Sequence, residues 1–147
     1  MHRTEYGAPS ISFILKKISD DKALTLFNNI AIAKDNGHIP LKKMNLSTKQ
    51  YYSRISGLVS AGLIKKKHGQ YYLTCLGKVV YNAHTLIGRA LNYYWKMKAI
   101  ESIQSSTGLE LAREDMQMLV ESLIDNHQVR DILLKSLTTV EALKMRQ

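Results

Sequence analysis

Residues 47–74 read STKQYYSRISGLVSAGLIKKKHGQYYLT, and this stretch decides the fold class. Its first part carries apolar residues at the spacing of a helix with one buried face. The residues expected to face inward are Tyr51, Ile55, Leu58 and Val59. Ser47 is a favourable N-cap and Gly62 a favourable stop, so the spacing predicts a helix over 47–61.

The second part of the stretch predicts a β-hairpin. Two β-prone runs flank His68-Gly69, a two-residue turn in which glycine supplies a positive φ. The turn fixes the cross-strand pairs: Ile64–Leu73 and Lys66–Tyr71 on one face, Lys65–Tyr72 and Lys67–Gln70 on the other. Thr74 is then expected to cap the helix that follows.

Further elements are expected on both sides of this stretch. Cap residues and apolar spacing predict a tail at 1–10, a short helix (or a strand) at 11–18, a helix over 22–34, and a short helix at 41–45. Downstream, one uninterrupted helix is expected from Cys75 to about Gln104, followed by a helical hairpin over 107–145. Cys75 itself is expected to be a small buried hydrophobe.

Positive charge is concentrated in the first half of the chain. Residues 1–78 hold 13 Lys and Arg against 4 Asp and Glu, whereas residues 79–147 hold 8 of each. No acidic residue occurs between Asn36 and Ile100. Such a segment attracts polyanions, of which nucleic acid is the first candidate and an anionic membrane the second.

Several classes of protein are not expected. A single cysteine cannot form an intramolecular disulfide or a cysteine-rich metal site. The N-terminus lacks the apolar core of a signal peptide, and no apolar run approaches the ~20 residues of a membrane span. There is no glycine-rich phosphate loop, paired-histidine metal motif or nucleophile elbow. We therefore expect a cytoplasmic, nucleoid-associated protein that is not an enzyme and has no membrane partner, metal or cofactor.

The order of helix, short helix, turn, helix and basic hairpin resembles a winged helix-turn-helix. Ser-Arg-Ile-x-x-Leu-x-x-x-Gly-Leu-Ile at 53–64 and Tyr-x-Leu-Thr-x-x-Gly at 71–77 are similar to the recognition helix and wing of bacterial and archaeal regulators of the ArsR and MarR type. The resemblance covers about half of the chain and implies duplex DNA as the partner. Metal-sensing members carry paired cysteines, so that role does not extend to this chain.

The outer face of helix 47–61 is short and polar, which suits the major groove. We expect base contacts from Thr48, Lys49, Tyr52, Ser53 and Ser56. Backbone contacts are expected from the preceding short helix, the helix start, its flank and the hairpin, namely Lys42, Lys43, Ser47, Gln50, Arg54, Lys65, Lys66, Lys67, His68 and Gln70. The resemblance implies the same assignment.

The helix from Cys75 has more apolar positions than one face can bury, so it needs two partners. One can be its own domain, and the other is expected to be a second copy of the chain. The residues assigned to this homodimer interface are Leu86, Ala90, Tyr93, Tyr94, Met97 and Ile100. The expected fold is mostly α with a small β-hairpin wing. The winged helix-turn-helix occupies 11–74, and a dimerisation region, the long helix plus the helical hairpin, occupies 75–147.

The function expected from these features is sequence-preferring binding of double-stranded DNA, typical of a transcriptional regulator. Two alternatives stay open: an architectural protein that coats DNA with little sequence preference, and a winged-helix module that binds other proteins in a transcription or repair complex. A cryptic enzyme is the weakest option. The sequence identifies no small-molecule effector.

Overall fold

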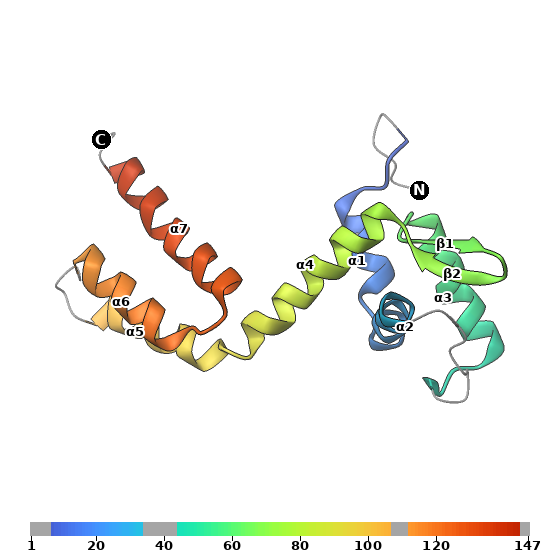
Figure 1. Ribbon diagram of the computed structural model, residues 1–147, viewed down its shortest axis with the longest axis horizontal. Helices are drawn as coiled ribbons and strands as arrows, with labels where there is room; N and C mark the ends of the chain where they lie inside the picture. The colour runs from blue at the N-terminus through green and yellow to red at the C-terminus, as the bar shows by residue number, and fades with distance from the viewer. Residues whose placement is uncertain (1–6, 34–43, 107–111, 145–147) are drawn as a thin grey trace. The chain divides into compact units, whose positions relative to one another are not determined.

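A computed structural model describes residues 7–33, 44–106 and 112–144, and these residues are mostly helical with one small antiparallel sheet (Figure 1). The elements in chain order are α1 (Ile11–Ile18), α2 (Asp21–Ile32), α3 (Thr48–Ser60), β1 (Ile64–Lys67), β2 (Gln70–Leu73), α4 (Cys75–Leu91), α5 (Tyr94–Ser106), α6 (Arg113–Leu123) and α7 (His127–Lys144). The chain divides into two units, Met1–Ala83 and His84–Gln147. This division lies within α4, whereas the sequence placed the boundary between Thr74 and Cys75.

The first two helices begin at polar side chains that satisfy free backbone amides. The Ser10 hydroxyl accepts a hydrogen bond from the Phe13 amide at 3.2 Å, which makes residues 11–18 a helix and not a strand. The Asp20 carboxylate accepts from the Ala23 amide at 2.9 Å at the start of α2. The short helix expected at 41–45 lies mostly outside the described residues.

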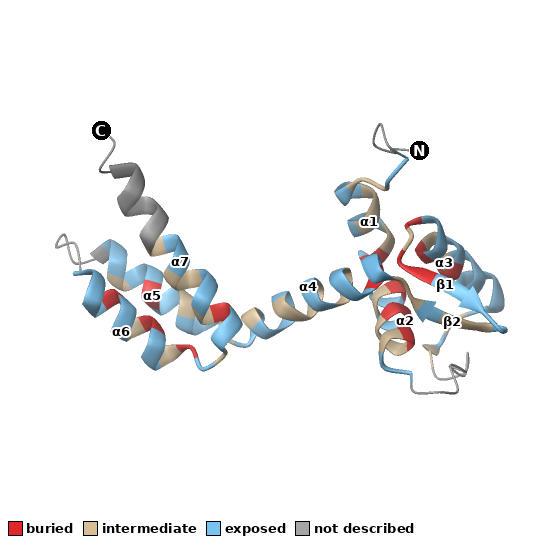
Figure 2. Cartoon of the chain, turned by 45° about the horizontal axis from the view of Figure 1, so that its top comes forward, coloured by how far each residue is buried: buried red, intermediate tan, exposed pale blue. Residues whose placement is uncertain are grey.

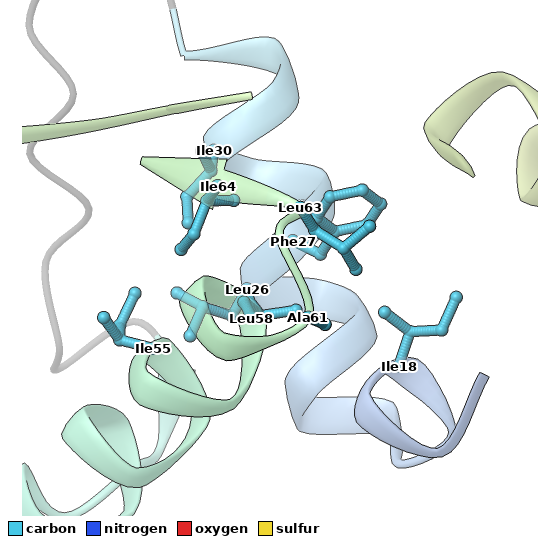
Figure 3. Packing of buried hydrophobic residues seen from close by; sticks show 9 residues of the cluster. All are labelled: Ile18, Leu26, Phe27, Ile30, Ile55, Leu58, Ala61, Leu63 and Ile64. Atoms are coloured by element: carbon cyan, nitrogen blue, oxygen red, sulfur yellow. The ribbon is translucent and has the colours of Figure 1, made fainter. Parts of the chain in front are cut away.

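Side chains from α1, α2, α3, β1 and the turn between α3 and β1 form the core of the first unit, and Figure 3 shows the nine that are buried. Leu26, Phe27, Leu58 and Leu63 are fully buried there. Burying each such side chain stabilises the fold by about 1.5–3 kcal/mol. The inward prediction is wrong for Val59, which is 44% exposed.

The hairpin has the predicted register. Ile64 pairs with Leu73, Lys65 with Tyr72, Lys66 with Tyr71 and Lys67 with Gln70. His68 and Gly69 form the turn with φ of 51° and 77°, the left-handed geometry that a two-residue hairpin turn needs. Figure 2 shows that β1 is buried only at its start, so its lysines are exposed.

Thr74 joins the end of the hairpin to the end of α3. Its hydroxyl donates to the carbonyl of Gly62, and its amide donates to the carbonyl of Leu63 at 3.0 Å. The same hydroxyl accepts from the Gly77 amide at 2.9 Å, which confirms Thr74 as the cap of α4. Gly77 is buried so close to the Leu63 carbonyl that a Cβ atom would overlap the oxygen.

The prediction of one helix from residue 75 to 104 is wrong. After Leu91, the amides of Asn92 and Tyr93 donate to the carbonyls of Arg89 and Ala90, three residues back, at 3.2 and 2.9 Å. This tight turn ends α4, and α5 begins at Tyr94. No glycine or proline marks the break. Cys75 is exposed, so its predicted burial is wrong as well.

The second unit has its own core, formed by Ile100, Met116, Val120, Ile124 and Val129. The guanidinium of Arg89 donates to the Gln128 side chain at 2.6 Å and links α4 to α7 within this unit. None of the described helices is long and apolar enough to cross a bilayer.

Most residues assigned to the dimer interface belong to this second core. Ile100 is buried in it, and partly buried side chains pack against it, including Leu86, Ala90, Tyr93 and Met97. Only Tyr94 of the six is largely exposed, at 43%. The additional apolar residues of α4 and α5 are therefore buried in part against the chain's own α6 and α7. Helical periodicity shows that a helix needs a partner, but it does not show whether the partner is the same chain or a second copy.

Candidate nucleic-acid interface

The start of α3 is fixed by a reciprocal pair of hydrogen bonds. The Ser47 hydroxyl accepts from the Gln50 amide at 3.2 Å, and the Gln50 side-chain oxygen accepts from the Ser47 amide at 3.1 Å. This capping box explains the sharp beginning of the helix. Ser47 and Gln50 were both expected to contact phosphates. In the structure their side chains instead fix the start of the helix.

The outer face of α3 is exposed and polar. Ile55 and Leu58 anchor the inner face in the core, and all five residues expected to contact bases are exposed, namely Thr48, Lys49, Tyr52, Ser53 and Ser56. Their spacing along the helix brings them to one side. The structure therefore presents hydroxyls, an ammonium group and an aromatic edge together on this face.

Tyr52, which is 59% exposed, is supported by its neighbour Tyr51. The two rings meet edge to face with centroids 5.2 Å apart. Burial, followed by the nearby hydroxyls of Tyr71 and Tyr52, raises the pKa of Tyr51. Tyr51 therefore stays uncharged at neutral pH, and it packs against the first core as Tyr71 of the hairpin does.

Gly57 explains how α1 supports α3. A Cβ atom at this position would lie 3.2 Å from the Cδ atom of Lys17, on α1. The Lys17 ammonium lies 5.1 Å from the centroid of the Phe13 ring. The glycine lowers the helix propensity of α3 by about 1 kcal/mol relative to alanine, and in exchange it allows the lysine stem to approach closely.

Arg54 does not have the geometry expected of a backbone contact. Its Nε donates to the Asp20 carboxylate at 3.1 Å, and its Nη1 donates to the Gln50 carbonyl at 3.3 Å. The Arg54 side chain is only 23% exposed. Hydrogen bonding from Ala23, together with Arg54, outweighs the effect of burial and lowers the pKa of Asp20. Arg54 thus ties α3 to the start of α2.

The hairpin divides its lysines between two faces. Lys66 shares a face with Tyr71, which packs against the first core, and its Nζ lies 5.8 Å from the centroid of that ring. Lys65 and Lys67 lie on the opposite face with Tyr72. All three lysines are exposed, and so is His68 at the turn. Only Lys66 is therefore on the side of the hairpin that faces Tyr51 of α3.

Gln70 is also engaged within the hairpin. Its side-chain oxygen accepts a hydrogen bond from the Tyr72 hydroxyl at 2.7 Å. This contact stiffens the start of β2 next to the turn. Lys42 and Lys43, the two remaining residues assigned to the DNA backbone, lie outside the described residues.

Sequence reasoning missed Lys78 as a candidate site residue. It lies in the first turns of α4, and together with Lys65 and Lys67 it lines a hollow in the first unit. Its position four residues after Thr74 could have indicated proximity to the wing, because the helix starts directly at the end of β2. Among the described residues, no group of histidine, cysteine and carboxylate side chains could hold a metal ion.

Comparison of the chain with models of known families, with curated proteins and with solved structures finds no match. The resemblance to winged-helix regulators therefore remains an expectation from the residues quoted above.

Proposed function

We propose that the chain binds double-stranded DNA through the outer face of α3 and the lysine-bearing hairpin, and acts as a transcriptional regulator. The proposal depends on one observation: an exposed polar helix face lies next to a cationic hairpin in a segment without acidic residues from 36 to 100. A helix of this kind fits the major groove, and hairpin lysines reach phosphates.

Base contacts are assigned to Thr48, Lys49, Tyr52, Ser53 and Ser56, since these residues are exposed on one side of α3. Backbone contacts are assigned first to Lys66 and His68. Arg54, Ser47 and Gln50 act indirectly by fixing the position and start of α3. This assignment names fewer residues in direct contact with the DNA backbone than the sequence predicted.

Fluorescence anisotropy with a labelled duplex tests the proposal. We expect the affinity to fall with salt, with a log–log slope of about −0.9 for each phosphate neutralised. Lys66→Ala should reduce the magnitude of that slope by about one and should lower the affinity for all DNA sequences alike. Lys98→Ala removes the same charge from a lysine paired with Glu101 in the second unit, so it serves as the control and should leave the slope unchanged.

Selection from a random duplex library then tests base readout. Wild-type protein should enrich a discrete motif, and Ser53→Ala should change it, because a lost base contact costs about 1–3 kcal/mol at one position only. Enrichment without any motif would indicate an architectural protein. Absence of DNA binding at about 0.15 M salt would reject DNA binding and favour a protein-interaction module.

The homodimer remains part of the proposal. Two copies would place two α3 helices against half-sites ~34 Å apart. Sedimentation equilibrium of the whole chain should give twice the monomer mass of 16.7 kDa. A monomer at all concentrations would exclude it.

A further inference from the structure

The first unit contains a hollow of about 700 Å³, and of its lining residues the DNA-binding proposal uses only His68. Its lining residues come from the end of α2, the hairpin and the first turns of α4. This volume falls within the range of small-molecule sites, which is about 300–1,000 Å³. The hollow is therefore large enough for a mononucleotide.

Three lysines from two elements converge on this hollow. Lys65 and Lys67 alternate along β1 and so share the face that lines it, and Lys78 reaches it from α4. His68 at the hairpin turn adds another donor. None of the described residues lining the hollow is acidic, and the ion pairs among the described residues involve other cations. Clustered ammonium groups repel one another, and a multiply charged anion would relieve that repulsion.

An aromatic ring and an amide complete the lining. Tyr72, the cross-strand partner of Lys65, is 42% exposed, and its hydroxyl is held by Gln70. Its ring is thus oriented beside the lysines. Asn82 lines the hollow from α4, one turn beyond Lys78. A planar base can stack on such a ring while phosphates contact the ammonium groups.

We propose that this hollow binds a nucleotide polyphosphate, with the phosphates on Lys65, Lys67 and Lys78 and the base against Tyr72. The site shares the hairpin with the proposed DNA interface, and a bound nucleotide would place negative charge next to the wing. We therefore expect the nucleotide to weaken DNA binding. That second expectation rests on the proposed function, whereas nucleotide binding itself does not.

Calorimetric titration of the full chain with ATP, without DNA, tests the binding. We expect saturation at one ATP per chain, weaker binding of tripolyphosphate and no detectable binding of adenosine. Lys78→Gln and Lys65→Gln should each weaken ATP binding about tenfold, as expected for loss of one charge-assisted hydrogen bond. Lys66→Gln is the matched control, because it removes the same charge from the other face of the same strand.

Several outcomes would overturn the proposal. The proposal is wrong if ATP does not bind. It is also wrong if Lys66→Gln weakens binding as much as Lys65→Gln, because equal weakening would indicate non-specific attraction to polyanions. Backbone NMR shifts locate the ligand: changes should centre on residues 65–67, 72 and 78, and changes centred on 48–56 would contradict the site.

Competition with a duplex separates this proposal from the DNA-binding one. ATP should displace DNA from the wild type, and displacement from Lys78→Gln, which should still bind DNA, should need about ten times more ATP. If ATP binds and no duplex does, nucleotide binding in the hollow is supported and the DNA-binding proposal is wrong. A third outcome is that DNA binds, ATP does not, and Lys78→Gln lowers the affinity for DNA as strongly as Lys66→Gln does. The hollow would then accept the phosphates of DNA, and the nucleotide proposal would be wrong.

Discussion

Single residues on α3 divide into those that can face a ligand and those that hold the helix in place. Arg54 is the clearest case, because its guanidinium is held by Asp20, which lies far from it in the sequence. Nothing in the residues around position 54 indicates that partner. The sequence predicts the outer face of α3 from local spacing, whereas a contact between residues 20 and 54 depends on how α2 and α3 pack.

The Asp20–Arg54 pair should make stability depend on pH. The pKa of Asp20 is lower in the folded chain than its ordinary value of 3.8, so its contribution is present at neutral pH and is lost as the pH falls below that value. Asp20→Asn keeps a capping side chain and removes the charge. Since the Asp20 side chain is 52% exposed, we expect a loss below about 1 kcal/mol at pH 7.

Urea unfolding at pH 7 and at pH 3 measures this difference. The gap between wild type and Asp20→Asn should shrink at pH 3. Asp125→Asn removes an exposed carboxylate from the second unit and serves as the control. A gap that is constant with pH would mean that the pair does not contribute through its charge.

At the scale of elements, the hairpin and the helix starts are predictable because local chemistry determines them. A two-residue turn at His68-Gly69 permits one register, and Ser47 and Thr74 each cap the helix that follows. The break at Asn92 was not predicted, because no glycine or proline marks it and the weak helix propensity of a single asparagine does not by itself end a helix. Tyr93, which lies in the turn, packs against the second core.

The junction between the hairpin and α4 should not tolerate a side chain at position 77. Gly77→Ala places a Cβ atom against the Leu63 carbonyl, so the backbone must shift, and we expect a loss of about 1–3 kcal/mol. Gly88→Ala is the matched control on the same helix. A Cβ atom there meets nothing within 4 Å, so the higher helix propensity of alanine should stabilise the chain by up to about 1 kcal/mol.

Thermal unfolding followed by circular dichroism compares the two variants. Opposite shifts of the unfolding temperature are expected. Equal shifts, or a stabilised Gly77→Ala, would show that α4 does not lie as close to the Leu63 carbonyl as the structure places it.

For the whole molecule, the important feature is that each unit has a separate buried cluster. Sequence periodicity identified some apolar residues of both clusters, such as Leu58 and Ile100, but not their partners. The same pattern on α4 and α5 fits a neighbouring helix of the chain or a second copy equally well. This is why residues such as Met97 and Ile100 were assigned to a dimer and lie in an intramolecular core.

The two clusters should respond separately to mutation. Leu58→Ala removes a fully buried side chain from the first cluster and should cost about 2–5 kcal/mol. Hydrogen exchange should then accelerate in α2, α3 and the hairpin, with little change in α6. Val120→Ala in the second cluster should give the reverse pattern. Equal acceleration in both regions for either variant would show that the chain unfolds as one cooperative unit.

The bonds from Thr74 to the carbonyls of Gly62 and Leu63 have a consequence for engineering. A hairpin of residues 64–73 transplanted alone into another protein would leave Thr74 and both carbonyls behind, so foreign residues would have to make these bonds. Its orientation would then be lost even if its strands still paired. The smallest portable cassette in this chain therefore runs from Ser47 to Gly77, and chimaeras should be cut at those two points.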